Sequence, residues 1–309
     1  MLWLRASTER IAVDAVRVCD DTFAVPRLPP WIRQPLRTDQ QYGAVQQVLA
    51  ELGLHTVCRS AHCPNQQECW NRGTATFMIL GNTCTRACQF CNVTTGRPNA
   101  PDAQEPQRVA EAAARMKLRH VVITSVTRDD LPDGGAGHFA STIAAVRSAM
   151  PAALIEVLTP DFGGSTAALD VVLAARPDVF NHNLETVRRL QPEVRPQADY
   201  VRSLGVLRYA AAYSPKPAVK SGLMVGLGET NDELLEAFRD LRAAGCELLT
   251  VGQYLRPKNS KREVARFVPP AEFDRLAAEA RALGFRAVAA GPLVRSSYRA
   301  EELTQAAAE

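Results

Sequence analysis

Short apolar runs alternate with amphipathic stretches along the chain from residue 76 onward. The apolar runs predict six strands, with the sequences TFMIL, HVVIT, ALIEVL, DVFNHNL, KSGLMVG and ELLTVGQ. The stretches between them have helical spacing, as in residues 105–117, where Val109, Ala112 and Met116 fall on one face. Strands that alternate with helices in this way predict parallel βα units.

The segments after the predicted strands indicate how these units are arranged. Six units, with a seventh apolar run at 286–292, can form a partial barrel or a doubly wound open sheet. No G-x-G-x-x-G motif comes after a strand, which weakens the dinucleotide-binding version of the open sheet. Each strand instead runs into a polar, glycine-rich or cysteine-rich segment, and parallel barrels assemble their active sites at that end. The sequence therefore predicts an α/β fold, a partial (β/α)6 TIM-type barrel with N-terminal and C-terminal extensions.

Less regular sequence flanks the predicted barrel. The first 40 residues are rich in proline and arginine and predict an irregular arm, which leads into a helix with a cap at Asp39. Residues 55–72 hold three cysteines with little periodicity and predict a loop. We therefore divide the chain into an N-terminal extension (1–75), a barrel (76–285) and a C-terminal extension (286–309).

The composition is typical of a soluble globular chain, with 309 residues of which 46% are hydrophobic and 22% charged. The net charge is +3, from 36 basic and 33 acidic residues, which is too small to predict binding to nucleic acid. No apolar run approaches the ~20 residues that span a bilayer, and the N-terminus lacks the continuous apolar core of a signal peptide. We expect a cytoplasmic protein that binds neither membranes nor nucleic acid.

Six of the eight cysteines are concentrated between positions 58 and 91. Cytoplasmic thiols are kept reduced, so this clustering indicates metal binding rather than disulfides. Cys84, Cys88 and Cys91 come after the first predicted strand with C-x3-C-x2-C spacing. A closed tetrahedral site needs four ligands, so either the fourth lies elsewhere or one coordination position is open. A zinc site completed by a distant Cys or His is the alternative, although its usual C-x2-C pair occurs only once.

A second triplet, Cys58, Cys63 and Cys69, has C-x4-C-x5-C spacing in the predicted loop. Three more thiolates imply a second cluster with its own missing ligand. The alternatives are core cysteines or a zinc site that uses His55 or His62. Neither alternative accounts for three thiolates in so polar a segment.

The first triplet, with Phe90 before its last cysteine, resembles the radical S-adenosylmethionine (SAM) superfamily. This resemblance implies a [4Fe–4S] cluster on Cys84, Cys88 and Cys91, whose open iron binds SAM; electron transfer to SAM then yields a 5′-deoxyadenosyl radical. Thiolate ligands and an open coordination position are consistent with this chemistry.

The second triplet closely resembles the auxiliary-cluster motif of the lipoyl synthases. Further segments match that family in the expected order, namely TSVTRDDLPDGGAGHFA, FNHNLETV, VRPQADYVRSLGVL, KSGLMVGLGE, VGQYLRP and GPLVRSSYRA. The resemblance implies an auxiliary [4Fe–4S] cluster on Cys58, Cys63 and Cys69, with Ser297, the second serine of RSSY, as its fourth ligand. A serine oxygen holds iron less firmly than a thiolate, which suits a cluster that is consumed as a sulfur source.

The resemblance also implies contacts to SAM. Asp129 and Asp130 fall where the superfamily binds the amino group of SAM, Asn183 and Glu185 could bind the ribose hydroxyls, and Gly226 belongs to the adenine-side motif. Residues of these types have ordinary explanations as well: a solvated acidic turn, a strand-to-helix cap and a tight turn. Arg195 and Arg202 are weaker candidates, for the carboxylate of SAM or for peptide contacts. Arg295 is a candidate for shielding the auxiliary cluster.

By resemblance, the expected reaction inserts two sulfur atoms at C6 and C8 of an octanoyl group on a lysine of a lipoyl carrier domain. The expected partners are the E2 subunits of 2-oxoacid dehydrogenases, the glycine cleavage H protein, a one-electron reductant and an iron–sulfur carrier that rebuilds the auxiliary cluster. We expect a monomer. The alternatives are a methylthiotransferase-like enzyme with two clusters and a non-enzymatic, zinc-stapled binding module.

Overall fold

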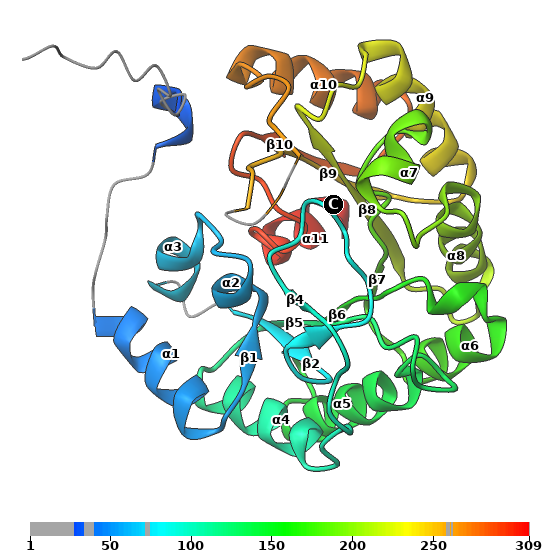
Figure 1. Ribbon diagram of the computed structural model, residues 1–309. Coiled ribbons are helices and arrows are strands. Elements are labelled where there is room, and N and C mark those ends of the chain that lie inside the picture. The colour runs from blue at the N-terminus through cyan, green and yellow to red at the C-terminus, as the bar shows by residue number, and fades with distance from the viewer. Residues whose placement is uncertain (1–27, 34–39, 72–74, 258–259, 261, 309) are drawn as a thin grey trace, which may run out of the picture.

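The strands of the computed structural model form one eight-stranded sheet that curves into an incomplete barrel (Figure 1). The structure describes residues 28–33, 40–71, 75–257, 260 and 262–308. In spatial order the strands are β1 (His55–Thr56), β2 (Thr76–Ile79), β5 (His120–Ser125), β6 (Leu154–Leu158), β7 (Val179–Asn181), β8 (Ala218–Val225), β9 (Leu248–Gln253) and β10 (Ala287–Gly291). Only β1 runs antiparallel to its neighbour. Among the described residues no ladder joins β1 to β10, so the barrel is not closed.

Helices cover the outside of this sheet. They are α4 (Glu105–Arg115), α5 (Ala136–Ala149), α6 (Thr166–Ala174), α8 (Tyr200–Ala212), α9 (Asn231–Ala243) and α10 (Pro270–Ala282). Figure 1 shows them around the ring of strands, with the N-terminal helices on the side where the ring is open. Local sequence starts several of them. Thr230, for example, caps α9 through a reciprocal capping box with Glu233.

Shorter elements lie between these strands and helices and at the two ends of the chain. They are η1 (Pro30–Ile32), α1 (Gln40–Glu51), α2 (Val57–Ser60), α3 (Gln66–Asn71), β3 (Thr83–Cys84), β4 (Thr94–Thr95), η2 (Phe162–Gly164), η3 (Arg188–Leu190), α7 (Gln191–Val194) and α11 (Ala300–Ala308). The pair β3–β4 forms a separate two-stranded sheet. It folds the chain after β2 back on itself.

The predicted partial (β/α) barrel is confirmed. All six predicted strands are present, and the seventh apolar run forms β10, which pairs in parallel with β9. β1 and β10 lie in the segments assigned to the two extensions, and both are hydrogen-bonded to the barrel sheet. The three-part division of the chain stays a prediction.

The prediction of a loop over 55–72 is wrong for the described residues of that segment. They form β1, α2 and α3, each too short to show a hydrophobic period. Thr56 starts α2 by accepting a hydrogen bond from the Arg59 amide, and the buried Trp70 fixes α3 against Tyr42. Tertiary packing therefore decides this segment. Asp39 and Cys19 lie outside the described residues.

The C-terminal helix α11 covers the N-terminal end of the barrel. Leu303 packs with Val179, Leu248 and Ala287, which are the first residues of β7, β9 and β10. Figure 1 accordingly shows α11 inside the ring of strands. The C-terminal ends of the strands, at the opposite side, are therefore where a site can be reached.

A buried polar layer crosses four neighbouring strands above α11. Lys220 of β8 donates to both carboxylate oxygens of Glu156 on β6, at 2.8 and 3.1 Å, and Asn181 and His120 also approach Glu156. Burial alone raises the pKa of Glu156, but the Lys220 charge and His120 reverse this and lower it below its usual range. The ion pair therefore stabilises the fold at pH values above the ordinary pKa of a glutamate. This stabilisation is lost as the pH falls through the lowered pKa of Glu156.

We predict that Lys220→Met lowers the free energy of unfolding by about 3–5 kcal/mol, because it leaves the Glu156 carboxylate buried without its counter-charge. Urea titration followed by circular dichroism measures this change. Lys216→Met is the matched control, since Lys216 pairs with Glu247 at the surface, and it should cost less than about 1 kcal/mol. An equal loss in both variants would show that the buried pair has no special role.

Candidate functional site

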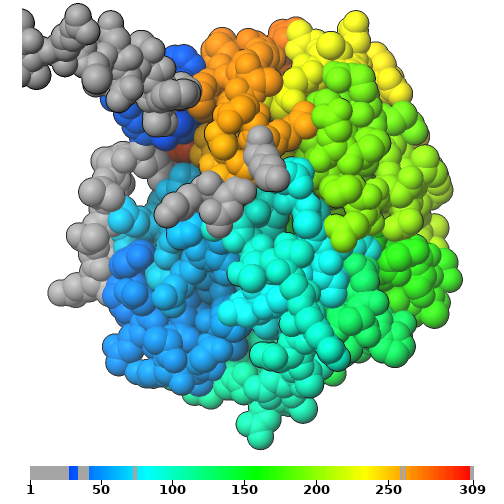
Figure 2. Space-filling model, viewed as in Figure 1, coloured from blue at the N-terminus to red at the C-terminus, as the bar shows by residue number. Residues whose placement is uncertain are grey.

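The loop that carries Cys84, Cys88 and Cys91 lies at the C-terminal end of the barrel. Backbone hydrogen bonds fix it on both sides: Thr85 donates to the Thr127 carbonyl after β5 at 3.1 Å, and Gln89 donates to the Val194 carbonyl of α7 at 2.9 Å. In Figure 2 the cyan segment after β2 lies over the centre of this face. Two separate parts of the chain, the segment after β5 and α7, therefore hold the first triplet in place.

The thiols of this loop already have amide donors around them. The Arg86 and Thr127 amides point at Cys84 Sγ from 3.4 and 3.3 Å, and the Val93 amide points at Cys91 Sγ from 3.5 Å. Cys91 is partly exposed to solvent, yet the protein packed around its thiol and the neighbouring Cys88 and Cys84 together raise its pKa to about 11. Metal must therefore displace protons here at neutral pH. Amide donors to sulfur are the kind that tune iron–sulfur clusters.

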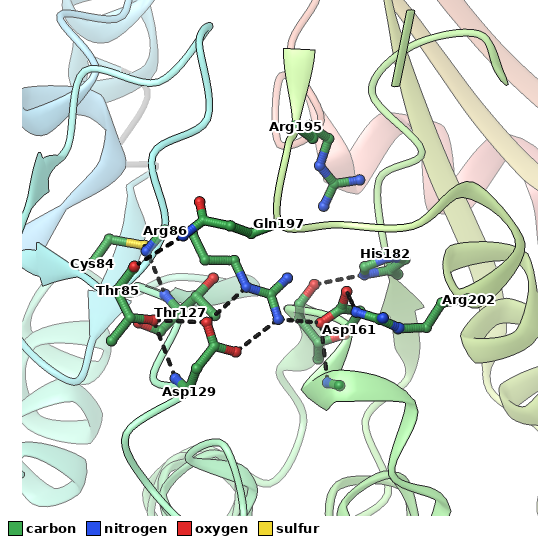
Figure 3. A network of polar contacts seen from close by, with 12 residues as sticks. Cys84, Thr85, Arg86, Thr127, Asp129, Asp161, His182, Arg195, Gln197 and Arg202 are labelled. Carbon is green, nitrogen blue, oxygen red and sulfur yellow. Dashed lines mark hydrogen bonds and ion pairs between the residues drawn. The ribbon is translucent and has the colours of Figure 1, made fainter. Parts of the chain in front are cut away.

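A buried ion-pair network lies directly beneath the loop (Figure 3). The Arg86 guanidinium binds Asp129 at 2.7 and 2.8 Å and Asp161 at 2.7 Å. Asp161 is fully buried and also accepts from the Gly163 amide, with Arg202 at 3.3 Å. Burial alone raises the pKa of Asp161, but Arg86 overrides this and brings it to about 2. The network joins the cluster loop to the ends of β5 and β6.

The end of β7 supplies a second group of polar side chains. Asn183 donates to Glu185 at 3.0 Å, and Glu185 lies at a backbone φ of 71°, an unusual conformation for a residue other than glycine. Arg195 donates to the Asn183 carbonyl at 3.1 Å. Burial raises the pKa values of Cys88 and Glu185, and the positive charge of Arg195 offsets part of this increase. Glu185 therefore lies within electrostatic reach of the first triplet.

His182, the residue before Asn183, is buried in the same region. Its Nδ1 donates to the Thr159 carbonyl at 2.9 Å, and its Nε2 has no hydrogen-bond partner among the described residues. Burial and Arg195 lower the pKa of His182 to about 4, so the ring is neutral at pH 7.

In the second triplet, Cys58 lies on α2, Cys69 on α3 and Cys63 in the turn between them, and this region is hydrogen-bonded to the C-terminal segment 293–299. Burial, with a smaller contribution from the charge of Cys63, raises the pKa of Cys58 to about 11. Arg295 lowers the pKa of Cys63, against the larger effect of burial. Arg295 also interacts with Glu185. One guanidinium therefore links the surroundings of the second triplet to the end of β7.

The two serines of RSSY have different environments. Ser296 Oγ accepts a hydrogen bond from Asn183 at 2.6 Å and is thereby occupied at the end of β7. The Ser297 hydroxyl has no hydrogen-bond partner in the part of the chain that the structure describes. Ser297 is therefore the serine whose oxygen remains available to a ligand.

Single-ion sites and clusters place different demands on their cysteines. A zinc site needs its sulfurs within about 2.3 Å of one ion, whereas each cysteine of a four-iron cluster binds a different iron. All six cysteines of the two triplets are described, and no group of three or more His, Cys, Asp or Glu side chains among the described residues is arranged to hold one metal ion.

Comparisons with known proteins agree with this site. The radical SAM superfamily matches residues 78–241. A lipoyl synthase of Thermus thermophilus is 58% identical over 277 residues, which cover 89% of this chain and 86% of that protein. A lipoyl synthase of Methylococcus capsulatus is 54% identical over 299 residues, which cover 96% of this chain and 92% of that protein. The chain belongs to the lipoyl synthase family. Lipoyl synthases are radical SAM enzymes that insert sulfur, and they use SAM and [4Fe–4S] clusters, so the methylthiotransferase-like alternative is excluded.

Solved structures support the fold alone. The crystal structure of HydG, a maturase of the [FeFe]-hydrogenase, has a TM-score of 0.56 at 16% identity, covering 68% of this chain and 50% of that chain. SuiB of Streptococcus suis bound to S-adenosylmethionine has a TM-score of 0.51 at 10% identity, covering 70% and 51%. No helix in the described ranges is long and apolar enough to cross a membrane.

The predicted SAM contacts have structural partners within the protein. Asp129 is paired with Arg86, Asp130 is paired with Arg128 at 2.8 Å, and Asn183 and Glu185 lie together at the end of β7. A Cβ on Gly226 would lie 2.3 Å from the Gln253 amide, so packing alone requires a glycine there. Their contacts to SAM stay predictions.

Sequence reasoning missed several residues that shape the site, namely Arg86, Asp161, Gln197 and Glu68. Arg86 carried one usable signal, because it is a charged residue inside the cysteine loop that ends up buried. Cys246, by contrast, is a buried core thiol that contacts the Val219 and Leu248 carbonyls, as its apolar sequence surroundings predict.

We predict that Arg86→Met strongly reduces reductive SAM cleavage and weakens iron binding at the first triplet, because Asp161 is left buried without its main counter-charge. Iron content and formation of 5′-deoxyadenosine measure this effect. Arg108→Met, which removes a surface pair with Asp102, is the control and should behave as wild type. Normal cleavage by Arg86→Met would show that the network does not support the loop.

Proposed function

We propose that this chain inserts two sulfur atoms at C6 and C8 of an octanoyl-lysine carried by a lipoyl domain. Membership in the lipoyl synthase family makes a lipoyl carrier protein the substrate. The observation that carries the residue assignments is the placement of the two cysteine triplets. One lies on the loop after β2, and the other lies in the α2–α3 region beside the RSSY segment.

In the proposed assignment, Cys84, Cys88 and Cys91 hold the cluster that binds SAM, near the polar groups at the ends of β5, β6 and β7. When bound, that cluster and SAM supply a 5′-deoxyadenosyl radical able to abstract hydrogen from unactivated C–H bonds. No acid–base side chain could deprotonate such bonds, which is why radical chemistry is required. The residues of the site bind and orient the substrates and exclude water.

Cys58, Cys63, Cys69 and Ser297 hold the auxiliary cluster, whose sulfur atoms are the second substrate. The charge of Arg295 acts on both Cys63 and Glu185, which supports a location of this cluster next to the radical site. The free hydroxyl of Ser297 supports it as the fourth ligand over Ser296. E2 subunits, the H protein, an electron donor and a carrier for cluster rebuilding are the proposed partners of a cytoplasmic monomer.

The overall proposal is tested by an anaerobic assay with SAM, a reductant and an octanoyl-lysine peptide. Mass spectrometry should detect two added sulfur atoms. Zinc in the isolated protein without acid-labile sulfide would contradict the proposal.

Mutations should distinguish the roles of the two cysteine triplets. Alanine at Cys84, Cys88 or Cys91 should abolish reductive SAM cleavage, because the radical source is lost. Alanine at Cys58, Cys63 or Cys69 should leave cleavage measurable and eliminate sulfur insertion. Deoxyadenosine and lipoyl product, quantified in the same reaction, distinguish these results. If both sets of variants cleave SAM normally, the assignment of clusters is incorrect.

Ser297→Ala should leave one iron of the auxiliary cluster without a protein ligand. SAM cleavage should persist and sulfur insertion should fall at least about tenfold, the effect of losing roughly 1.4 kcal/mol of stabilisation. Ser297→Cys should keep a four-iron cluster and insert sulfur poorly, because a thiolate holds iron more firmly. Ser296→Ala is the neighbouring control and should cost less. A more damaging Ser296→Ala would move the ligand by one residue.

A further inference from the structure

A carboxylate next to the second triplet is bound by the two residues after Ser297. The Tyr298 hydroxyl donates to both Glu68 oxygens, at 3.0 and 3.1 Å, and Arg299 donates to Glu68 at 2.9 Å. Glu68 immediately precedes Cys69, and Tyr298 immediately follows Ser297. The contact therefore joins the two chain segments one residue away from two proposed cluster ligands.

A second tether lies on the other side of Ser297. The Asn65 side chain, two residues after Cys63, donates to the Leu293 carbonyl at 2.6 Å. Residues 293–299 are thus attached to the α2–α3 region at both of their ends. Between these tethers the segment forms a turn in which the Tyr298 amide donates to the Arg295 carbonyl at 2.9 Å. The position of Ser297 relative to the triplet depends on both tethers.

The chemistry of the Glu68 contact favours a firm hold. The Tyr298 hydroxyl reaches both oxygens of the Glu68 carboxylate, and Arg299 binds one of the same oxygens. A hydrogen bond from a hydroxyl to a carboxylate is stronger than a hydrogen bond between two neutral groups. Arg299 lies at a φ of 49°, where the chain turns from the segment into α11. The contact of Glu68 with Tyr298 and Arg299 therefore fixes the chain at the turn where it changes direction.

A cavity of about 340 Å³ borders the same residues from the N-terminal end of the barrel. Its lining includes Cys69, Glu68, Tyr298 and Arg299 together with His120 of β5. Cys69 and the three residues that make the Glu68 contact therefore border one cavity.

We propose that Glu68, Tyr298 and Arg299 form a positioning clamp that holds Ser297 on the auxiliary cluster and sets how readily its oxygen leaves. The inference rests on the proposed function, in which Ser297 is a ligand. The clamp residues touch neither SAM nor the octanoyl chain. They act through the backbone of Cys69 and Ser297.

The test measures how fast a ferrous chelator removes iron from the reconstituted protein. Tyr298→Phe should release iron from the auxiliary cluster about tenfold faster, because one charge-assisted hydrogen bond is lost. Iron on the Cys84 cluster and the rate of SAM cleavage should stay at wild-type values. Sulfur inserted per deoxyadenosine formed should fall. Glu68→Gln removes the charge that strengthens the bonds from both Tyr298 and Arg299, so it should accelerate iron release at least as much.

Tyr209→Phe is the matched control, because Tyr209 donates to Asp170 at 2.6 Å on the outer helices. It should release iron at the wild-type rate. The decisive comparison is the double variant Ser297→Ala/Tyr298→Phe. If the clamp acts through Ser297, removing Tyr298 should add nothing once the serine oxygen is gone.

Each remaining outcome has a definite meaning. An equal acceleration by Tyr298→Phe in the wild-type and Ser297→Ala backgrounds would show a general staple and overturn the clamp. Fast release from Ser297→Ala with wild-type release from both Tyr298→Phe and Glu68→Gln would also overturn it, while the ligand assignment would stand. Wild-type release from Ser297→Ala would instead reject Ser297 as a ligand and with it the proposed function of RSSY.

Discussion

The route of residues 293–299 along the barrel depends on two glycines at which no side chain fits. A Cβ on Gly252 of β9 would lie 2.1 Å from the Val294 carbonyl, and one on Gly222 of β8 would lie 2.8 Å from Asn183 and 3.1 Å from Ser296. Backbone can approach backbone this closely only where the Cβ is missing. The segment therefore runs from the C-terminal end of β10, past these two strands, to α11 at the opposite end. This path brings RSSY beside the second triplet.

Buried charges at the C-terminal end of the barrel are stable because each has an opposite charge nearby. Asp161 has Arg86, and Glu185 has Arg195 and Arg295, which partly offset the effect of burial on its pKa. A charge buried without such a partner would cost several kcal/mol. The two arginines near Glu185 face different triplets, Arg195 towards Cys88 and Arg295 towards Cys63. A change of charge at either triplet therefore alters the electrostatic environment of the Glu185 carboxylate.

The barrel was predictable from the sequence because buried parallel strands are continuous apolar runs and their polar ends mark one face. The two cysteine triplets were predictable from spacing. The ion pairs of Arg86 were not, since its partners Asp129 and Asp161 lie 43 and 75 residues away and leave no local signal. The short helices α2 and α3 were missed because they depend on packing around Trp70. The prediction that RSSY lies near the second triplet rested on family resemblance, because the spacing of residues in the sequence does not indicate it.

The two triplets are held by parts of the structure that differ in rigidity. The Cys84 loop is hydrogen-bonded to the β5 end, to α7 and to Gln197, all within the barrel framework. In the second triplet, Cys58 and Cys69 lie on helices of four and six residues and Cys63 lies in the turn between them. Side chains of this region and of the C-terminal segment tether the two together. Elements with few long-range backbone contacts open more easily than core strands. A site that generates a radical in every turnover needs the rigid support, whereas a cluster that gives up its sulfur has to come apart. In the proposed assignment, the lasting site thus lies on the barrel, and the consumable one lies where the α2–α3 region meets the C-terminal segment.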